Sequence, residues 1–486
     1  MSRKTVRSKR RVRRQPPASG RKPAPKLPPH AIEASAAELL TFHRLFQTCF
    51  QRREQRQWSL FYLCGQLSNL ERKTIEAMVL MLHGTKANAV RDLQRFMSEG
   101  GWDQPRMIEQ HQTLVGEWLG EPAGVVIADG SGFPKQGDHS VGVAYQYCGH
   151  LGKVAKCQQG VFLVYASSRG YAFLDERLYL PEDWFTAAYR ERWEAARIPE
   201  DWSFRTEPEL ALEMITAVTQ RAGVPFHWVT ADETYGKSPV FCDGIAALGK
   251  WYLVEVPADT RVWLRTPAIE PPGQGLVGRP RLHPRVSHHA PRPREVCELA
   301  ARLPKSKWRR RIIKEGSKGP LVAEFAFLRA TTLRDGLPGP RVGVIFRRTL
   351  GRKPEIKFYF SNAPTTCPPG EFIRVSGLRW PVETALEEGK GEVGMDHYET
   401  RTWLGWHRHM THTFLAHLFL MRLRLLWQKK SRAYHGSGTP TYRTGHRRRS
   451  VSLTRRARHP ALSAMSQPCG LSFSPQANVE TPSSAR

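Results

Sequence analysis

The sequence predicts an α/β protein: a mixed sheet with flanking helices, preceded by a helical N-terminal domain and interrupted by a β-rich insertion. Two short apolar runs, residues 124–129 and 226–232, have the length and composition of buried strands, and each ends in an aspartate. Between residues 31 and 120, apolar residues recur with a period near 3.6, which is the spacing of amphipathic helices. Between residues 258 and 358, frequent Pro and Gly are followed by short apolar runs, which favours strands.

Length and composition indicate a folded protein with more than one structural unit. A chain of 486 residues exceeds one core of ordinary size, and 40% hydrophobic content excludes a wholly disordered chain. The net charge of +30 is concentrated in two runs without any acid: residues 1–26 hold 11 Lys and Arg, and residues 428–460 hold 10. A solvated tail is an ordinary alternative for either run alone. Two basic tails that flank a basic body favour nucleic acid over a membrane surface as the partner.

The cysteines and the apolar segments indicate the cellular compartment in which this protein is expected. Eight scattered cysteines without a CxxC pair argue against a zinc ribbon and a disulfide scaffold, and fit reduced thiols in a cytoplasmic protein. Residues 2–14 are basic with no apolar stretch behind them, so no secretory signal is expected. The longest apolar segment, 414–427, is interrupted by His417, Arg422 and Arg424, which predicts a core helix and no membrane span.

Changes in composition divide the chain into six predicted units. They are a basic disordered tail (1–29), a helical domain (30–120), the first part of the α/β core (121–257), a β-rich basic insertion (258–360), the C-terminal core helices (361–427) and a basic, Ser/Pro-rich disordered tail (428–486). The helical domain includes a turn at Gly84 and Thr85, with Thr85 as a candidate N-cap for a helix over 86–97. Two interpretations of this domain stay open: a helix-turn-helix that binds DNA, and a helical cap packed on the core.

Within the core and the insertion, further elements follow from the apolar pattern. Strands are expected at 141–147, 160–166, 251–256, 321–328 and 341–346, and a helix at 208–222.

Asp129 and Asp232 are the first candidates for a functional site, because each closes a predicted buried strand. Strand ends are where an α/β sheet presents its site. One such aspartate is weak support, since Asp followed by Gly also starts ordinary turns. Two strand-end acids make a shared site the better interpretation.

A third acid lies on a later helix that is expected to begin between Ser376 and Pro381. Arg379, Glu383 and Lys390 share one face if that helix already includes Arg379, although a solvated ion-pair ladder would show the same spacing. Three carboxylates from separate elements can hold two divalent cations about 4 Å apart for phosphoryl transfer. Oxygen ligands favour Mg²⁺, or Mn²⁺ in its place. Arg379 and Lys390 are then expected to contact DNA phosphate.

These motifs resemble those of the DDE transposases of bacterial insertion sequences, which have an RNase H-like catalytic core. Asp129 and Asp232 match the first two acids of the family. The last three positions of a third motif (Tyr, two residues, Arg, three residues, Glu, six residues, Lys) match Arg379, Glu383 and Lys390, with Ser376 at the Tyr position. Residues 140–149 and 396–406 are also similar to the family, and the resemblance covers about residues 42–427.

The resemblance implies metal-dependent cleavage of DNA at the ends of an element and strand transfer into target DNA. It further implies a homodimer on double-stranded DNA at the nucleoid, no organic cofactor, and a β-rich insertion before the glutamate. In such relatives the insertion helps to form a DNA hairpin. The Arg- and Ser-rich C-terminus departs from the family, which keeps an alternative open: an inactive or repurposed copy that acts as a DNA-binding regulator.

Several other side chains are weighed as site residues. Glu387 and Glu388 compete with Glu383 for the place of the third acid. Lys135 and Lys153 lie in Gly-flanked loops, where they are candidate phosphate contacts or ordinary surface lysines. Four histidines lie in an amphipathic segment rich in Leu and Phe, and packing or contact with the DNA backbone is favoured over a metal cluster. They are His407, His409, His412 and His417.

Overall fold

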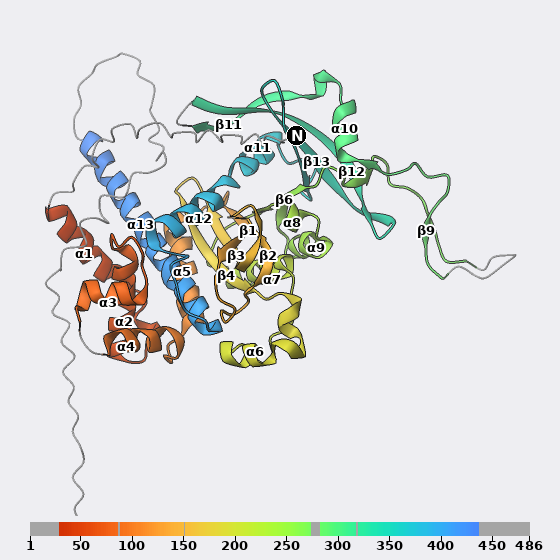
Figure 1. Ribbon diagram of the computed structural model, residues 1–486. Helices are drawn as coiled ribbons and strands as arrows, with labels where there is room; N and C mark the ends of the chain where they lie inside the picture. Colours follow the sequence, from red (N-terminus) through yellow and green to blue (C-terminus); the bar gives the residue numbers. More distant parts are fainter. Residues whose placement is uncertain (1–28, 86–87, 150, 274–281, 317–318, 437–486) are drawn as a thin grey trace, which may run out of the picture.

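The computed structural model describes residues 29–85, 88–149, 151–273, 282–316 and 319–436 (Figure 1). The predictions for residues 1–28 and 437–486 lie outside these ranges. The N-terminal region is helical, as predicted. Its helices are α1 (Pro29–Arg44), η1 (Gln47–Cys49), α2 (Arg53–Leu67), α3 (Ile75–His83), α4 (Ala89–Ser98) and α5 (Gln104–Leu119). Thr74 and Asp103 cap α3 and α5, each accepting a backbone N–H three residues on.

The start of α4 differs from the prediction. Thr85 is not its N-cap; the helix begins at Ala89, after Asn88 in the left-handed region at φ 70°. Asn tolerates this conformation better than most residues, so the chain can reverse there before the helix starts. Leu93 and Phe96 then lie buried on the inner face, as the helical period predicted.

A mixed sheet follows the helices, and its order places three parallel strands beside an antiparallel set. Strand β1 lies between antiparallel β3 and parallel β5; β6 continues parallel to β5, while β2 and β4 pair with β3. The strands are β1 (Val125–Pro134), β2 (Ala144–Cys148), β3 (Lys153–Ala166), β4 (Tyr171–Tyr179), β5 (Trp228–Ala231) and β6 (Trp251–Val256). This is the RNase H-like mixed sheet that the family resemblance implied.

Helices connect these strands. Thr206 and Glu209 form a capping box at the start of α7, with Pro208 in its first turn, which is why the helix begins one residue before the predicted 208. The connecting elements are η2 (Glu182–Phe185), η3 (Ala187–Tyr189), α6 (Arg190–Ala196), α7 (Glu207–Arg221), α8 (Glu233–Gly236) and α9 (Pro239–Ala247).

The insertion extends the same sheet beyond β6. Strand β14 pairs antiparallel with β6, and β13, β12, β7 and β10 follow in order; β11 pairs with the start of β12, on the same side as β7. In Figure 1 this part, green to teal, projects away from the N-terminal helices. Its elements are β7 (Arg261–Trp263), β8 (Ile269–Glu270), β9 (Arg285–Val286), β10 (Arg294–Glu295), α10 (Val296–Arg302), η4 (Lys305–Lys307), β11 (Arg309–Gly316), β12 (Gly319–Arg334), β13 (Leu337–Thr349) and β14 (Ile356–Ser361).

Three helices complete the described chain: α11 (Pro369–Gly377), α12 (Trp380–Val393) and α13 (Trp403–Gly436). Helix α13 passes residue 427, where the sequence predicted a disordered tail to begin, so that boundary is wrong. No Gly or Pro occurs between residues 428 and 435, and nothing in that stretch breaks the helix. None of the described helices is long and apolar enough to cross a membrane.

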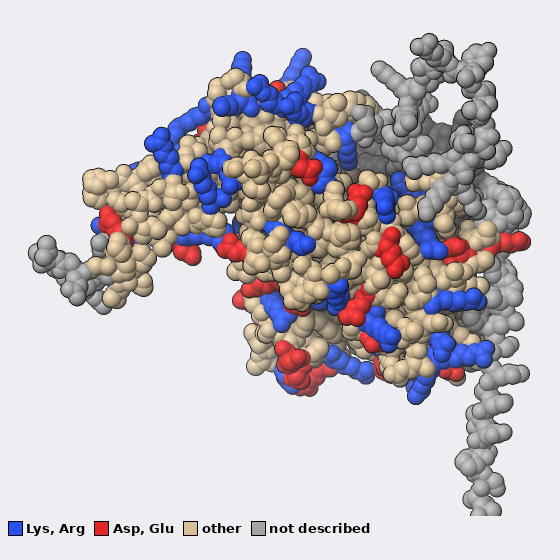
Figure 2. Space-filling view, turned by 180° about the vertical axis from the view of Figure 1, so that it is seen from behind, with Lys and Arg blue, Asp and Glu red and all other residues tan. Residues whose placement is uncertain are grey.

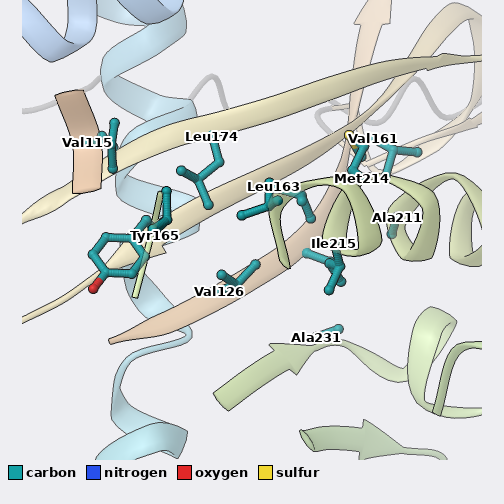
Figure 3. Close-up of a cluster of buried hydrophobic side chains, with 14 of the residues drawn as sticks. Val115, Val126, Val161, Leu163, Tyr165, Leu174, Ala211, Met214, Ile215 and Ala231 are labelled. Carbon is teal, nitrogen blue, oxygen red and sulfur yellow. The ribbon is translucent and has the colours of Figure 1, made fainter. Parts of the chain in front are cut away.

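Both faces of the sheet are covered. On one face, strand residues Val126, Leu163 and Leu174 pack with Ile215 of α7 and Val115 of α5, all fully buried (Figure 3). Full burial of such a side chain contributes about 1.5–3 kcal/mol. On the other face α13 packs against β4, and the rings of Phe173 and Phe414 stack with centroids 4.6 Å apart. The sheet is therefore held rigidly between helices, which fixes the positions of its strand ends.

Candidate active site

Asp129 and Asp232 lie level with each other on neighbouring parallel strands. Strands β1 and β5 pair with Ala128 opposite Ala231, so the two aspartates take the next position on each strand. The Oδ1 of Asp232 accepts the Thr234 N–H at 2.9 Å and caps α8. The structure thus brings together the two acids that the sequence paired, at the carboxyl ends of parallel strands.

Strand β1 does not end at Asp129, contrary to expectation. It continues to Pro134 because β3 stays paired with it, from Asp129 opposite Phe162 to Pro134 opposite Cys157. The predicted Gly-Ser-Gly turn is therefore part of the strand. Asp129 marks the level at which the parallel pairing with β5 stops.

The third predicted acid reaches this level from α12. Arg379 has helical backbone angles, φ −70° and ψ −32°, so it lies on the same face of α12 as Glu383, one turn earlier. Its Nη1 is 3.3 Å from Glu383 Oε1, and its Nη2 is 3.8 Å from Asp129 Oδ2. The guanidinium therefore links the glutamate of α12 to the aspartate of β1.

Several acidic side chains and one guanidinium influence each other's pKa in this group. Burial raises the pKa of Asp129 to about 7; Arg379 opposes the shift, whereas Asp232 and Glu383 add to it. Burial alone would lower the pKa of the Arg379 guanidinium, but Asp129, Glu255, Asp232 and Glu383 together raise it. Several carboxylates thus share one cationic side chain.

Glu255 joins this group, although the sequence analysis did not single it out. Strand β6 pairs with β5 so that Val254 lies opposite Ala231, which places Glu255 level with Asp232. Its Oε1 is 4.0 Å from Nε of Arg379. The signal was present in the sequence, because an acid inside a buried apolar run is unusual unless it is paired.

Glu207 is a second acid that sequence reasoning missed. It lies in the first turn of α7, and a Cβ added to Gly130 would meet its Oε2 at 2.8 Å. Burial raises the pKa of Glu207 to about 7, opposed by a hydrogen bond from Gln159 and increased by Asp232. The buried hydroxyl of Tyr235, near the same acids, has no hydrogen-bond partner among the described residues. No sequence motif marks Glu207, since its place depends on how α7 crosses β1.

The predicted lysines differ in where they lie. Nζ of Lys390 donates to the Gly132 carbonyl at 3.1 Å and lies over the Phe133 ring. Nζ of Lys135 donates to the Tyr398 carbonyl at 3.3 Å, and burial lowers its pKa to about 8. Both ammonium groups thus pack against the protein around β1, whereas Lys153 is exposed at the start of β3.

The alternatives to Glu383 point elsewhere. Glu388 accepts hydrogen bonds from Tyr171 at 2.8 Å and from His417 at 3.1 Å, away from the aspartates, and Glu387 is exposed. Ser376, at the position of the family's tyrosine, is buried in α11 and donates to the Ile373 carbonyl at 2.8 Å. Of these three glutamates, Glu383 alone forms an ion pair with the Arg379 guanidinium in the described part of the chain.

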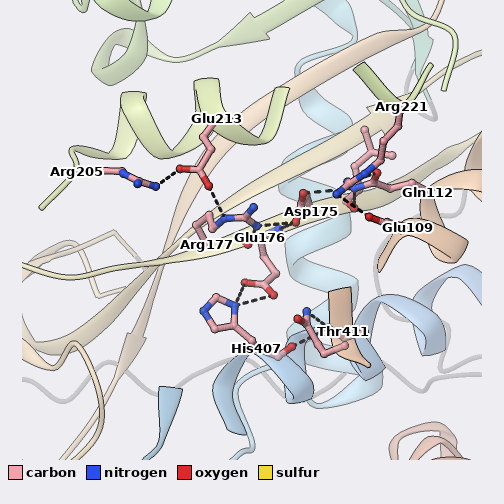
Figure 4. A network of polar contacts seen from close by, with 12 residues as sticks. Glu109, Gln112, Asp175, Glu176, Arg177, Arg205, Glu213, Arg221, His407 and Thr411 are labelled. Carbon is pink, nitrogen blue, oxygen red and sulfur yellow. Dashed lines mark hydrogen bonds and ion pairs between the residues drawn. The ribbon is translucent and has the colours of Figure 1, made fainter. Parts of the chain in front are cut away.

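The histidines of α13 pack in the interior, as predicted. His407 pairs with Glu176, a fully buried acid whose pKa burial raises well above its usual range (Figure 4). The same network continues through Asp175 and Arg177 to Glu213 of α7. His409 and His412 bond instead to side chains of α2: Tyr62 at 2.7 Å and Ser59 at 3.1 Å. These contacts join α13 to the sheet and to the N-terminal helices.

Comparison with known protein families shows the family to which this chain belongs. Residues 45–320, more than half of its length, match the DDE superfamily endonucleases. The chain belongs to this family. The match includes Asp129 and Asp232 and ends before Arg379 and Glu383. DDE endonucleases generally use divalent metal ions.

One similar transposase matches a shorter part of the chain than the family does, and one solved structure aligns with a longer part. A probable transposase for insertion sequence element IS701 from Microchaete diplosiphon is 30% identical over 181 residues, which is 36% of this DDE endonuclease and 41% of the relative. The crystal structure of the NurA nuclease from Sulfolobus solfataricus aligns over 69% of this chain and 94% of its own, with 11% identity and a TM-score of 0.24. That score is too low to indicate a shared fold.

The donor set of this DDE endonuclease fits a hard divalent cation, because carboxylate oxygens are its preferred ligands. In the described part of the chain, no three His, Cys, Asp or Glu side chains are already arranged to hold a metal ion. The Arg379 guanidinium lies between Asp129 and Glu383 instead.

Positive charge gathers on the insertion. Figure 2 shows Lys and Arg side chains along the upper edge, where the insertion lies, while acidic and basic side chains mix over the body below. The exposed basic residues of the insertion include those of η4 and β11: Lys305, Lys307, Arg309, Arg310 and Arg311. Such a surface suits the DNA backbone.

Proposed function

We propose that this chain is an insertion-sequence transposase, which cuts DNA at the ends of its element and joins the freed 3′ ends to target DNA. The observation that carries the proposal is the level placement of Asp129 and Asp232, with Glu383 linked to them through Arg379. Membership of the DDE endonucleases supports the cleavage chemistry. The partial relative, itself a probable transposase for an insertion sequence element, supports transposition.

Asp129, Asp232 and Glu383 would hold Mg²⁺, with Mn²⁺ able to replace it. When bound, such cations activate a water or a 3′-hydroxyl for in-line attack on phosphorus and stabilise the leaving oxygen. The protein's own part is to keep three carboxylates on separate rigid elements and to place a guanidinium beside them. Once Asp129 and Glu383 turn to the cation, the two Nη groups of Arg379 are free to bind a phosphate as a fork.

The remaining contacts are assigned by exposure. Lys153 is the exposed candidate for a phosphate contact, while Lys135 and Lys390 brace β1. The buried bonds between α2 and α13 support the helical domain as a cap on the core. Because both ends of an element must be paired before cutting, a homodimer on double-stranded DNA at the nucleoid is expected, without an organic cofactor.

The test uses the purified chain and a duplex that carries the end of its element. Alanine at Asp129, Asp232 or Glu383 is expected to abolish Mg²⁺-dependent cleavage and to leave DNA binding intact, measured by gel cleavage and by fluorescence anisotropy. Glu387→Ala is the matched control on the same helix and should cut like the wild type. A wild-type chain that binds DNA but cuts with neither Mg²⁺ nor Mn²⁺ would overturn the proposal in favour of a DNA-binding regulator.

A further inference from the structure

Glu255 stands in line with the two aspartates, yet its carboxylate is held from the other side. The register of β1, β5 and β6 places Asp129, Asp232 and Glu255 in consecutive positions along one row of the sheet. On its far side β6 pairs with β14 of the insertion, with Tyr359 opposite Glu255. Glu255 therefore lies at the boundary between the insertion and the candidate site.

Two side chains of β14 fix the carboxylate of Glu255. Nζ of Lys357 donates to Oε2 at 3.0 Å and to Oε1 at 3.2 Å, and the Tyr359 hydroxyl donates to Oε1 at 3.4 Å. The Glu255 side chain is only 16% exposed, so these bonds are screened less than those of a surface pair. The orientation of Glu255 is thus set by the insertion.

The Nε atom of Arg379 is the guanidinium nitrogen that lies nearest the Glu255 carboxylate. Its Nε is buried and lies 4.0 Å from Glu255 Oε1, and it has no hydrogen-bond partner among the described residues. The two Nη atoms point to Asp129 and Glu383. Since those two acids are the proposed cation ligands, Glu255 is the acid of this group that can stay with Arg379 when the cation binds.

We propose that Glu255 is a positioning residue for Arg379: held by Lys357 and Tyr359, it retains the Nε end and leaves both Nη groups for a DNA phosphate. The inference rests on the proposed function, because it assigns the phosphate contact of that same site. Without the Glu255 charge, the guanidinium is drawn toward Asp129 and Glu383, where it competes with the cation. The insertion thereby reaches the reacting phosphate through a chain of three side chains.

A double-mutant cycle tests this role on the full chain with end DNA. Glu255→Gln keeps the shape and removes the charge, and it should slow single-turnover cleavage about 10- to 100-fold, the usual effect of losing an outer partner of an active-site group. In an Arg379→Ala background the same change should have no further effect, because Glu255 acts through Arg379. Lys357→Met, which frees Glu255 from β14, should lower the rate in the same direction and also lose its effect in that background.

A second readout is the salt dependence of DNA binding in the presence of Ca²⁺. Loss of one phosphate contact lowers the slope of log affinity against log salt by about 0.9. Glu255→Gln, Arg379→Ala and the double variant should each show this single loss. Glu324→Gln is the control, since it removes the charge of a comparable pair with Arg348 on β12 and β13, and it should change neither readout.

The outcomes separate the two proposals. Additive losses in the cycle, or a wild-type rate and slope in Glu255→Gln, would overturn the positioning role. If Glu255→Gln does not fold, Lys357→Met decides in the same cycle. A wild-type chain that binds DNA without cutting it refutes the proposed function, and the salt slopes then decide on Glu255 alone. A chain that does not bind DNA overturns both.

Discussion

Replacement of Asp129 by asparagine should stabilise the cation-free protein at neutral and basic pH. Burial, Asp232 and Glu383 raise the pKa of Asp129 from 3.8 to about 7 in the folded chain. A raised folded-state pKa means that the stability contributed by this group is fully present below pH 3.8 and is lost as the pH rises to about 7. At about 1.36 kcal/mol per pKa unit, ionisation of Asp129 costs about 4 kcal/mol at pH 8.

Asparagine carries no charge at any of these pH values, so Asp129→Asn escapes that cost. In EDTA its free energy of unfolding should exceed that of the wild type by up to about 4 kcal/mol at pH 8, and the excess should be less than half as large at pH 5. Denaturant unfolding at the two pH values measures both quantities. Mg²⁺ should raise the wild-type midpoint and leave that of the variant unchanged, because ligand binding to the folded state stabilises it.

The control is Glu387→Gln, which removes an exposed carboxylate from helix α12. If Asp129→Asn differs from the wild type by a constant amount at both pH values, the buried like-charge cluster does not exist as described. A variant less stable than the wild type at pH 8 would also refute the reasoning.

Two further changes probe how the site is held in place. A Cβ at Gly236 would overlap the carbonyl oxygen of Glu255 and lie 3.0 Å from its carbonyl carbon, so Gly236→Ala should cost about 3 kcal/mol of unfolding free energy. The control is Gly391→Ala on α12, where a Cβ meets open space, and this change should stabilise the protein by about 1 kcal/mol. A wild-type denaturation midpoint for Gly236→Ala would contradict the close approach of α8 to β6. Lys390→Met removes the bond to the Gly132 carbonyl and should cost about 1 kcal/mol while leaving the salt slope of DNA binding unchanged. A slope reduced by about 0.9 would instead make Lys390 a phosphate contact.

The sequence predicted those parts of the site that depend on local pattern. Asp129 and Asp232 each close an apolar run, and parallel pairing of those runs with their ends in register brings the two acids level. Arg379 and Glu383 are four residues apart on one helix, so their contact needs only the helical period. Each of these inferences uses short-range geometry.

Other features depend on register and on packing between distant elements, which no local pattern contains. Glu255 enters the row because β6 pairs with β5 in one register, and a shift of one residue would turn its side chain to the other face. Glu207 depends on the crossing of α7 over β1 at Gly130. The extension of β1 past Asp129 was missed because its glycines indicated a turn, while pairing with β3 keeps them extended.

The path of the insertion explains how Glu383 comes to face the aspartates at all. The chain leaves the core after β6 and returns as β14, which pairs with β6 itself, so the two ends of the insertion lie side by side within the sheet. Closing so long a segment costs little more than closing a short one, because the entropy of loop closure grows only with the logarithm of length. Helices α11 and α12 follow directly after β14 and are thereby delivered to the side of β1 and β5. The insertion thus continues the sheet that carries Asp129 and Asp232, and the pairing of β14 with β6 connects it to Glu255, which lies level with these aspartates.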